Sequence, residues 1–167
     1  IAQAGLKPGS IDTEAVHFGL APRLTDARRL EHADLSLRLL TTHSPEEAST
    51  LAQKLEETNR ERQRLTKEQV ARAQEKVRLW ASTQPIIVVD AQEFSTGIIG
   101  LIAGQLTEEY YRPAVAIALT DHTARGSARS IPEFNIVEAF RTCADLFTRY
   151  GGHAQAAGFE MPSDPDR

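Results

Sequence analysis

The sequence has very few of the residues that cross-link small proteins or bind soft metals. Cys143 is its only cysteine and Met161 its only methionine among 167 residues. One thiol cannot build a disulfide framework or a zinc ribbon, so Cys143 indicates a reducing compartment, and we expect a cytoplasmic protein. No apolar run is long enough to span a membrane, and no segment resembles a signal peptide. Because the chain opens on Ile1, we expect it to be a piece of a longer protein.

Motifs of hydrolytic and nucleotide-binding enzymes are also missing. The five histidines include no adjacent pair and no His-Glu-x-x-His spacing, and there is neither a Gly-x-Ser-x-Gly elbow nor a Walker loop. The acidic pair Asp164 and Asp166 flanks a proline near the end, which is typical of a tail rather than of a metal site. We therefore expect these residues to bind rather than to break bonds, with no catalytic group and no metal or cofactor of their own.

The composition that remains is that of a globular protein with an acidic surface. Hydrophobic residues make up 41% and charged residues 25% of the chain, and the net charge is −4. This balance excludes a protein whose whole surface binds nucleic acid. Any nucleic-acid site must be a local basic pocket.

The clearest predicted element is a long helix. Ser44, Pro45 and Glu47 form a capping box with proline at the first helical position. The helix is expected to run to about Trp80, a length of about 54 Å for about 36 residues. Its two ends carry apolar residues, whereas residues 59–64 are polar on every side. This pattern favours a solvated bridge between two bodies over a coiled coil, because sustained heptads are missing through the middle.

The pattern changes period after this helix. Residues 86–90 and 114–119 are short β-branched or apolar runs, expected to be strands buried on both faces, and the small-residue segment 94–106 between them is expected to be a helix. A further helix beginning at Asn135 is expected to end at Tyr150-Gly151-Gly152, and residues 158–161 to return as an edge strand. The predicted fold is α/β: a long bridging helix followed by a small mixed-sheet domain with flanking helices.

Two sequence segments in this domain have the composition of a phosphate-binding site. Gly151 and Gly152 at a helix end would leave backbone N–H groups pointing one way, and His153 follows at once. Upstream, Ser127 and Ser130 offer hydroxyl donors and Arg129 a planar fork that suits phosphate, with Gly126 admitting close approach. If this stretch is a strand, Ser127 and Arg129 share a face. The alternatives are a simple helix cap and an ordinary exposed hairpin strand.

A smaller basic cluster lies near the start of the chain. Arg23, Arg28 and Arg29 fall within seven residues, close to Thr25 or Asp26, either of which is expected to cap a helix. Such a cluster is typical of a solvated or salt-bridged surface, and it can also contribute to an anion site.

Together these phrases resemble the DHH phosphoesterases, most closely the RecJ-type single-strand-specific DNA exonucleases. The likeness spans nearly the whole chain, and its motifs occur in the family's order. They are Gly19-Leu20-Ala21-Pro22-Arg23-Leu24 with Ala27 and Arg29, Asn59-Arg60-Glu61-Arg62, Gly97-Ile98-Ile99-Gly100-Leu101-Ile102-Ala103, Tyr111-Arg112-Pro113, Gly126-Ser127-Ala128-Arg129-Ser130-Ile131-Pro132, and Gly151-Gly152-His153-Ala154 with Ala156-Ala157-Gly158.

The resemblance implies a domain organisation in which catalysis and substrate binding lie in different parts of the protein. Residues 1–43 would be the end of a catalytic DHH domain, 44–82 a connecting helix and 83–167 the DHH-associated substrate-binding domain. The complete enzyme would hydrolyse single-stranded DNA from its 5′ end with manganese or magnesium, in DNA repair and recombination, with a single-strand-binding protein or a helicase as a possible partner. The residues implied to bind the DNA backbone or its 5′-phosphate are Arg29, Ser127, Arg129, Ser130, Gly151, Gly152 and His153.

Two phrases depart from the family pattern. Residues 25–29 read Thr-Asp-Ala-Arg-Arg where the family usually has Asn-Ala-Ala-Gly-Arg, and Phe94-Ser95 stands where it usually has Trp-His. Two other functions therefore stay open: the substrate domain of a DHH phosphodiesterase for short oligonucleotides or cyclic dinucleotides, and a non-catalytic binding or scaffold module of the same family.

Overall fold

The computed structural model describes residues 1–7, 9, 11–30, 34–81 and 83–163, although the side chains of residues 2, 26–30, 80 and 81 lie outside that description. The chain forms two compact units, Ile1–Leu65 and Thr66–Arg167, and the boundary falls inside one long helix. The division into domains at 43/44 and 82/83 stays a prediction.

The first unit is helical. Its elements are the short turns Ala2–Ala4 and Ala15–Leu20, then α1 (Ala21–Leu30), α2 (Asp34–Thr41) and the first part of α3 (Pro45–Lys76). The expected cap at Thr25 or Asp26 is wrong, because α1 already begins at Ala21. Within α1 the hydroxyl of Thr25 donates to the carbonyl of Ala21, one turn back.

The second unit is built on one five-stranded sheet of order β1-β2-β3-β5-β4. Its elements are η3 (Val77–Ala81), β1 (Ile87–Ala91), α4 (Ile99–Tyr110), β2 (Ala114–Leu119), β3 (Thr123–Arg129), α5 (Ile136–Thr142), the turn Ala144–Leu146, β4 (Arg149–His153) and β5 (Ala156–Pro162). β1 and β2 pair in parallel across α4, and every other pairing is antiparallel. The predicted strand–helix–strand unit and the mixed-sheet α/β class are confirmed.

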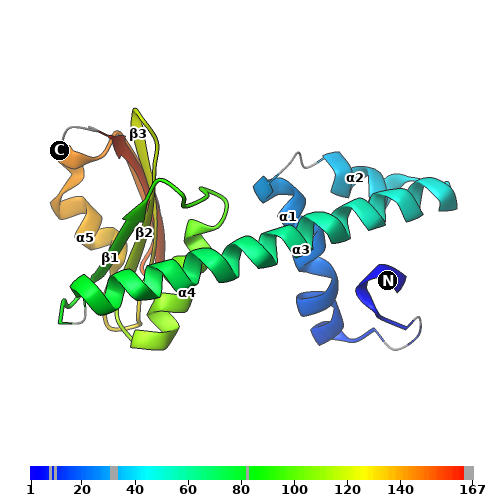
Figure 1. Cartoon of the computed structure of the whole chain (residues 1–167), viewed down its shortest axis with the longest axis horizontal. Helices are drawn as coiled ribbons and strands as arrows, with labels where there is room; N and C mark the ends of the chain where they lie inside the picture. Colours follow the sequence, from blue (N-terminus) through cyan, green and yellow to red (C-terminus); the bar gives the residue numbers. More distant parts are fainter. Residues whose placement is uncertain (8, 10, 31–33, 82, 164–167) are drawn as a thin grey trace. The chain divides into compact units, whose positions relative to one another are not determined.

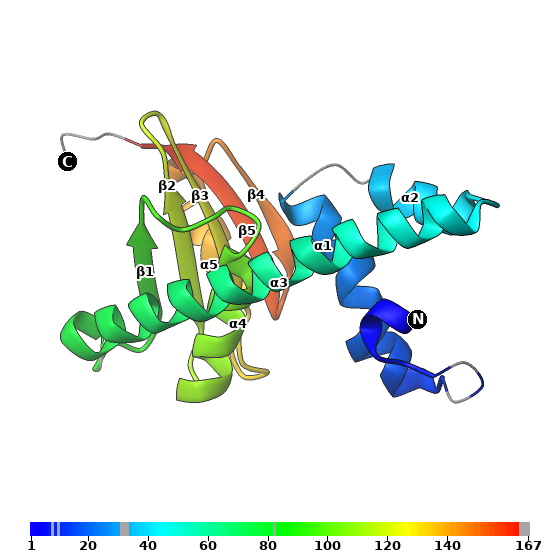
Figure 2. The ribbon, with the colours of Figure 1, turned by 45° about the vertical axis from the view of Figure 1, so that its right-hand side comes forward.

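The two faces of the sheet carry different helices (Figure 1). α4 lies against the face that carries Ser127, because a side chain on Gly100 would meet the Ser127 hydroxyl. α5 covers the opposite face through Ile136 and Phe140, which pack against Ala128 and Phe159. Figure 2 shows the strands fanning from β1 at one edge to β4 at the other, with α4 and α5 on opposite sides.

An aromatic cluster fills the α5 side of the sheet. The ring of Phe159 lies 5.3 Å from that of Phe140 and 4.6 Å from that of Phe147, measured between centroids. Each buried ring of this size stabilises the fold by about 1.5–3 kcal/mol. Gly126 leaves room for this cluster, because an added Cβ there would lie 2.2 Å from the Phe159 ring. The glycine expected to admit a ligand therefore admits an aromatic side chain instead.

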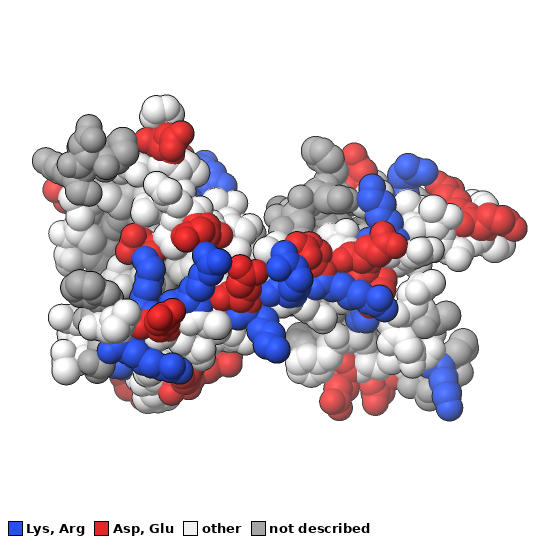
Figure 3. Space-filling model, in the orientation of Figure 1, with Lys and Arg blue, Asp and Glu red and all other residues white. Residues whose placement is uncertain are grey.

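Helix α3 carries charged side chains of both signs along its length (Figure 3). They pair within the helix three or four residues apart, as Arg64 does with Glu61 and Arg72 with Glu68. The expectation of a middle that is solvated on every side is nevertheless wrong: Asn59 is only 1% exposed, and its side-chain oxygen accepts from Arg62. A polar residue can be buried here because a helical neighbour satisfies it.

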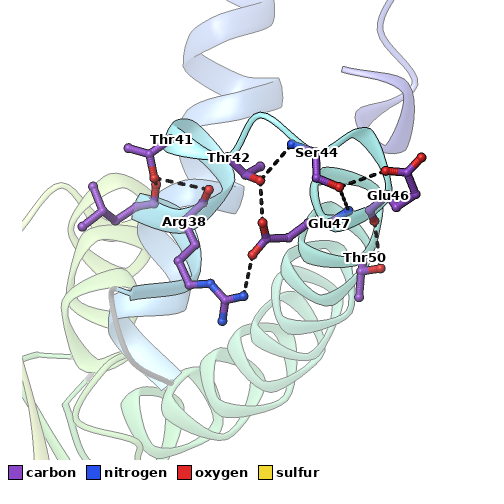
Figure 4. Close-up of polar contacts among 8 residues, drawn as sticks. Arg38, Thr41, Thr42, Ser44, Glu46, Glu47 and Thr50 are labelled. Atoms are coloured by element: carbon purple, nitrogen blue, oxygen red, sulfur yellow. Dashed lines mark hydrogen bonds and ion pairs between the residues drawn. The ribbon is translucent and has the colours of Figure 1, made fainter.

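The start of α3 is capped by a network that joins it to α2 (Figure 4). The predicted Ser44 cap forms, with the Glu47 N–H donating to the Ser44 hydroxyl at 3.2 Å. The return half of the capping box does not form. The Ser44 N–H donates to Thr42 instead, and the Glu47 carboxylate accepts from Thr42 and Arg38. The glutamate thereby ties α2 to α3.

Three expected features of the sheet are wrong. The helix that begins at Asn135 ends at Thr142, so Gly151 and Gly152 lie in β4 and not at a helix end. The last strand, β5, is an inner strand between β3 and β4, because β4 folds back on it as a hairpin and forms the edge. β1 is buried on one face only, with Val88 53% exposed, because it is the opposite edge of the sheet.

Candidate phosphate-binding face of the sheet

Alternate residues of β3 place three polar side chains on the face that α4 covers. Arg125, Ser127 and Arg129 occupy every second position of the strand, and successive side chains of a strand point to opposite faces. The prediction that Ser127 and Arg129 share a face is therefore confirmed by the strand.

Arg129 turns back along its own strand toward Ser127. Its Nη1 lies 3.3 Å from the Ser127 hydroxyl and donates to the Ala128 carbonyl at 2.9 Å. The guanidinium consequently sits at the level of Ser127 and not at the level of its own Cα. Thr107 of α4 holds the Arg129 backbone, with its hydroxyl 3.3 Å from the Arg129 carbonyl.

The first turn of α4 reaches the same point. A Cβ added to Gly100 would lie 3.2 Å from the Ser127 hydroxyl oxygen and 3.3 Å from Nη2 of Arg129. A helix N-terminus carries partial positive charge, which attracts anions. In α4 the N–H groups of Ile99 and Leu101 already donate to the carbonyls of Ser95 and Ile98. A hydroxyl, a guanidinium and the positive end of a helix thus converge, and this arrangement favours a phosphate.

Beyond Ser127 the floor of this face is made of glycine. Ser127 pairs with Gly158 of β5, which pairs in turn with Gly151 of β4, so the three residues form one row across the sheet. A groove of about 290 Å³ opens over this part of the sheet, lined by Arg125, Gly126, Arg149, Tyr150, Gly151, Gly158, Phe159 and Glu160. The absence of side chains at Gly158 and Gly151 leaves room for a ligand to approach the backbone.

The remaining predicted residues are distributed around this row. His153 pairs with Ala156, which pairs with Arg129, so His153 and Arg129 flank β5 on the same face. Ser130 lies just past β3, where its hydroxyl donates to the Phe134 carbonyl at 2.6 Å. Arg29 lies in α1, and its side chain is outside the described residues.

Gly152 is needed for the close packing of β4 against β5 in the hairpin. Its φ is +149°, and an added Cβ would lie 2.4 Å from the Ala156 carbonyl oxygen and 2.5 Å from the Ala157 Cα. No other residue fits between the strands at this point. The structure therefore assigns Gly152 a steric role, whereas Gly151 has open space where its side chain would be.

Sequence reasoning missed the far end of the groove. Arg125 and Arg149 both donate to one oxygen of Glu160, at 3.0 and 2.7 Å, from the strands on either side of β5. Hydrogen bonds from Arg125 and then from Arg149 hold the pKa of Glu160 below its ordinary value, so the carboxylate stays ionised. The alternation Arg-x-Ser-x-Arg in β3 and Arg-x-Gly-x-His in β4 was the available signal.

Within the described residues, no group of three or more histidine, cysteine, aspartate or glutamate side chains could hold a metal ion. Among the same residues, no helix is both long and apolar enough to cross a membrane. Cys143 is a free thiol, half-buried at the C-terminal end of α5.

The second half of the chain matches a known family. The family model described as "DHHA1 domain" matches residues 83–167. The chain is 35% identical over 158 residues to the single-stranded-DNA-specific exonuclease RecJ of Bacillus subtilis, covering 93% of this chain and 20% of that protein. It is 35% identical over 146 residues to the RecJ of Thermus thermophilus, covering 87% and 21%. The chain therefore spans about a fifth of the length of these relatives.

Solved structures agree with this likeness. The crystal structure of Thermus thermophilus RecJ in complex with Mg²⁺ superposes with a TM-score of 0.79 at 35% identity, over 88% of this chain and 23% of that one. The structure of an exonuclease RecJ bound to manganese gives 0.79 at 33% identity, over 96% and 40%. Both similarities extend beyond residues 83–167 into the helical part of the chain.

Proposed function

The chain belongs to the DHHA1 domain family, and from this premise we propose that it is the DNA-binding part of a RecJ-type 5′→3′ exonuclease. Its relatives bear the name single-stranded-DNA-specific exonuclease. In this proposal the chain grips the backbone and the 5′-phosphate of single-stranded DNA, and hydrolysis takes place elsewhere in the complete protein.

One observation carries the proposal: Ser127, Arg129 and the first turn of α4 converge beside Gly158 and Gly151, which line the groove. Arg129 supplies charge and a planar pair of donors, Ser127 supplies a hydroxyl, and the helix N-terminus supplies partial positive charge. His153 donates a further hydrogen bond from the other side of β5. None of these groups reads a base, so the grip is independent of sequence.

The other predicted residues take supporting roles. Gly151 keeps the floor open and Gly152 permits the hairpin. Ser130 has a single O–H, which the Phe134 carbonyl already accepts, so we assign it to positioning the loop after β3. Arg29 stays among the proposed DNA-binding residues on the strength of the family pattern alone.

We assign metal binding and hydrolysis to residues outside this chain. The curated relatives are several times longer, and solved structures of RecJ proteins contain Mg²⁺ or Mn²⁺. No step is derived for a metal on the residues described here, since they offer no ligand cluster. We place the complete enzyme in the cytoplasm, in DNA repair and recombination, with manganese as its metal; the lone thiol of Cys143 supports the compartment.

The test is binding of a 5′-phosphorylated single-stranded oligonucleotide, with EDTA present to prevent cleavage. Arg129→Ala is expected to cost about 1.5–3 kcal/mol of binding free energy, because it removes hydrogen bonds to a charged group. The matched control is Arg72→Ala. Arg72 is an exposed arginine of α3 that pairs with Glu68 and Glu93, and its removal is expected to cost less than about 1 kcal/mol of binding free energy. Equal effects in two folded variants would show that the phosphate binds elsewhere.

A further inference from the structure

Two arginines and a glutamate form a charged bridge across three strands at the far end of the groove. Arg125, Glu160 and Arg149 are direct cross-strand neighbours on β3, β5 and β4. Oε2 of Glu160 accepts from Nη2 of both arginines. The glutamate side chain is 23% exposed, whereas those of Arg125 and Arg149 are 50% and 68% exposed.

Stability alone is a weak reason for this arrangement. Exposed ion pairs contribute little to folding, and two guanidiniums on one carboxylate leave a net charge of +1 on an otherwise acidic chain. All three residues line the groove whose floor is Gly158 and Gly151. A positive rim around an open stretch of backbone suits an extended anionic chain.

The spacing between rows separates this bridge from the site at Ser127. The row of Arg125, Glu160 and Arg149 lies two residues along each strand from the row of Ser127, Gly158 and Gly151. Two residues of a strand span about 7 Å. That length is similar to the separation of successive phosphates in an extended single strand.

We propose that Arg125 and Arg149 form a second backbone-phosphate subsite for single-stranded DNA, next along the groove from the phosphate held by Ser127 and Arg129. The inference rests on the proposed function and extends it by one nucleotide. Because both arginines reach Glu160 on the central strand, their guanidiniums are held over β5, in the path of the DNA.

Glu160 sets the strength of this subsite. A guanidinium has five N–H donors, and the hydrogen bonds to Glu160 use one from each arginine, so a phosphate can be bound by others. The ionised carboxylate orients the two arginines when no DNA is bound and repels the phosphate when DNA arrives. Its removal should therefore strengthen binding, and removal of either arginine should weaken it.

The experiment measures the affinity of the complete polypeptide for a single-stranded oligothymidylate of about ten nucleotides, within the usual site size of such grooves. It is run in EDTA over a series of salt concentrations. Arg125→Ala and Arg149→Ala should each make the slope of log K against log salt shallower by about 0.7, the value for one lost single-strand phosphate contact. The control is Arg141→Ala on α5, whose arginine is 60% exposed and paired with Glu138 on the other side of the sheet.

Two carboxylate variants give the opposite sign. Glu160→Gln should tighten binding at low salt, while Glu138→Gln, which removes the same charge away from the groove, should leave it unchanged. A gain in affinity cannot come from misfolding, so this arm holds even if an arginine variant is unstable.

The result that overturns the inference is that Arg125→Ala and Arg149→Ala behave as Arg141→Ala, or that Glu160→Gln fails to tighten binding. Arg129→Ala, measured in parallel, distinguishes failure of the second subsite from failure of the proposed function. If Arg129→Ala weakens binding and Arg125→Ala does not, only the second subsite fails. If Arg129→Ala has no effect, the proposed function itself fails.

Discussion

Gly151 and Gly152 are neighbours in β4, but their missing side chains have different consequences. At Gly152, the backbone has a φ of +149° and the space of a Cβ is occupied by Ala156 and Ala157. At Gly151, no atom lies within 4 Å of that space. Gly152 is required by the hairpin, whereas Gly151 keeps the groove open.

Gly152→Ala is therefore expected to destabilise the protein by at least about 1–3 kcal/mol, because a strained φ and a backbone clash are added together. The matched variant Gly151→Ala should stay within about 0.5 kcal/mol of the parent, as surface substitutions usually do. Urea unfolding of both variants checks this. Equal stabilities would mean that β4 does not pair with β5 in the register described.

Glu56 couples the stability of the first unit to pH. Burial of this carboxyl raises its pKa, but hydrogen bonds from Arg23 and Arg60 outweigh burial, so the pKa lies below the ordinary 4.5. The unfolded chain therefore takes up the proton at a higher pH than the folded chain does. The stabilising contribution is complete above about pH 4.5 and is lost as the pH falls through the folded-state pKa.

The expected result is that acid weakens the parent more steeply than it weakens Glu56→Gln, which has no proton to take up at this position. Thermal unfolding between about pH 7 and about pH 3 measures the difference. Glu57→Gln, at the exposed neighbouring position, serves as the control and should follow the parent. Identical acid profiles for the parent and Glu56→Gln would contradict the role given to Arg23 and Arg60.

Among the elements, α3 was predicted well at its start because its signals are local. A serine, a proline and a glutamate within four residues determine where the helix begins, and the Glu47 N–H does bond to Ser44. The burial of Asn59 could not be predicted in this way, since it depends on packing and on a bond to Arg62 that no local pattern requires.

Ser44→Ala should lower the stability of the first unit by about 1 kcal/mol, through loss of the cap. The control is Ser49→Ala one turn on, where alanine is the better helix former and stability should be equal or slightly higher. Chemical unfolding followed by circular dichroism measures both. A smaller loss for Ser44→Ala than for Ser49→Ala would show that Thr42 and Arg38 hold the end of the helix without Ser44.

The hairpin of β4 and β5 is the part of the candidate site that could not be predicted from the sequence. Two glycines after an apolar helical pattern are typical of a helix end, and the turn at Ala154 and Gln155 carries none of the usual hairpin residues. Ser127 and Arg129 could be assigned to one face from strand alternation alone. The pairing of Ser127 with Gly158, and of Glu160 with two arginines, depends on register, which no single strand encodes.

At the scale of the whole molecule, a net charge of −4 coexists with a groove whose rim is basic. The acidic balance discourages general adhesion to nucleic acid, while the arginines of β3 and β4 concentrate positive charge on one face. This distribution suits a protein that holds one strand in one place.

The 167-residue chain by itself is expected not to hydrolyse single-stranded DNA, because its described residues hold no cluster able to bind a metal and activate water. The measurement is release of nucleotides from a 5′-phosphorylated oligonucleotide in the presence of manganese. Activity that survives repurification of the chain would contradict the assignment of hydrolysis to other residues of the complete protein.

Recognition of a 5′-phosphate by Arg129 and its neighbours can be measured in one comparison. The affinity of the complete polypeptide and of its Arg129→Ala variant is measured in EDTA for one oligonucleotide with a 5′-phosphate and for the same oligonucleotide with a 5′-hydroxyl. The parent should prefer the phosphate by about 1.5–3 kcal/mol, and Arg129→Ala should lose most of this preference. If Arg129→Ala binds more weakly but keeps the full preference, the 5′-phosphate is recognised by other residues.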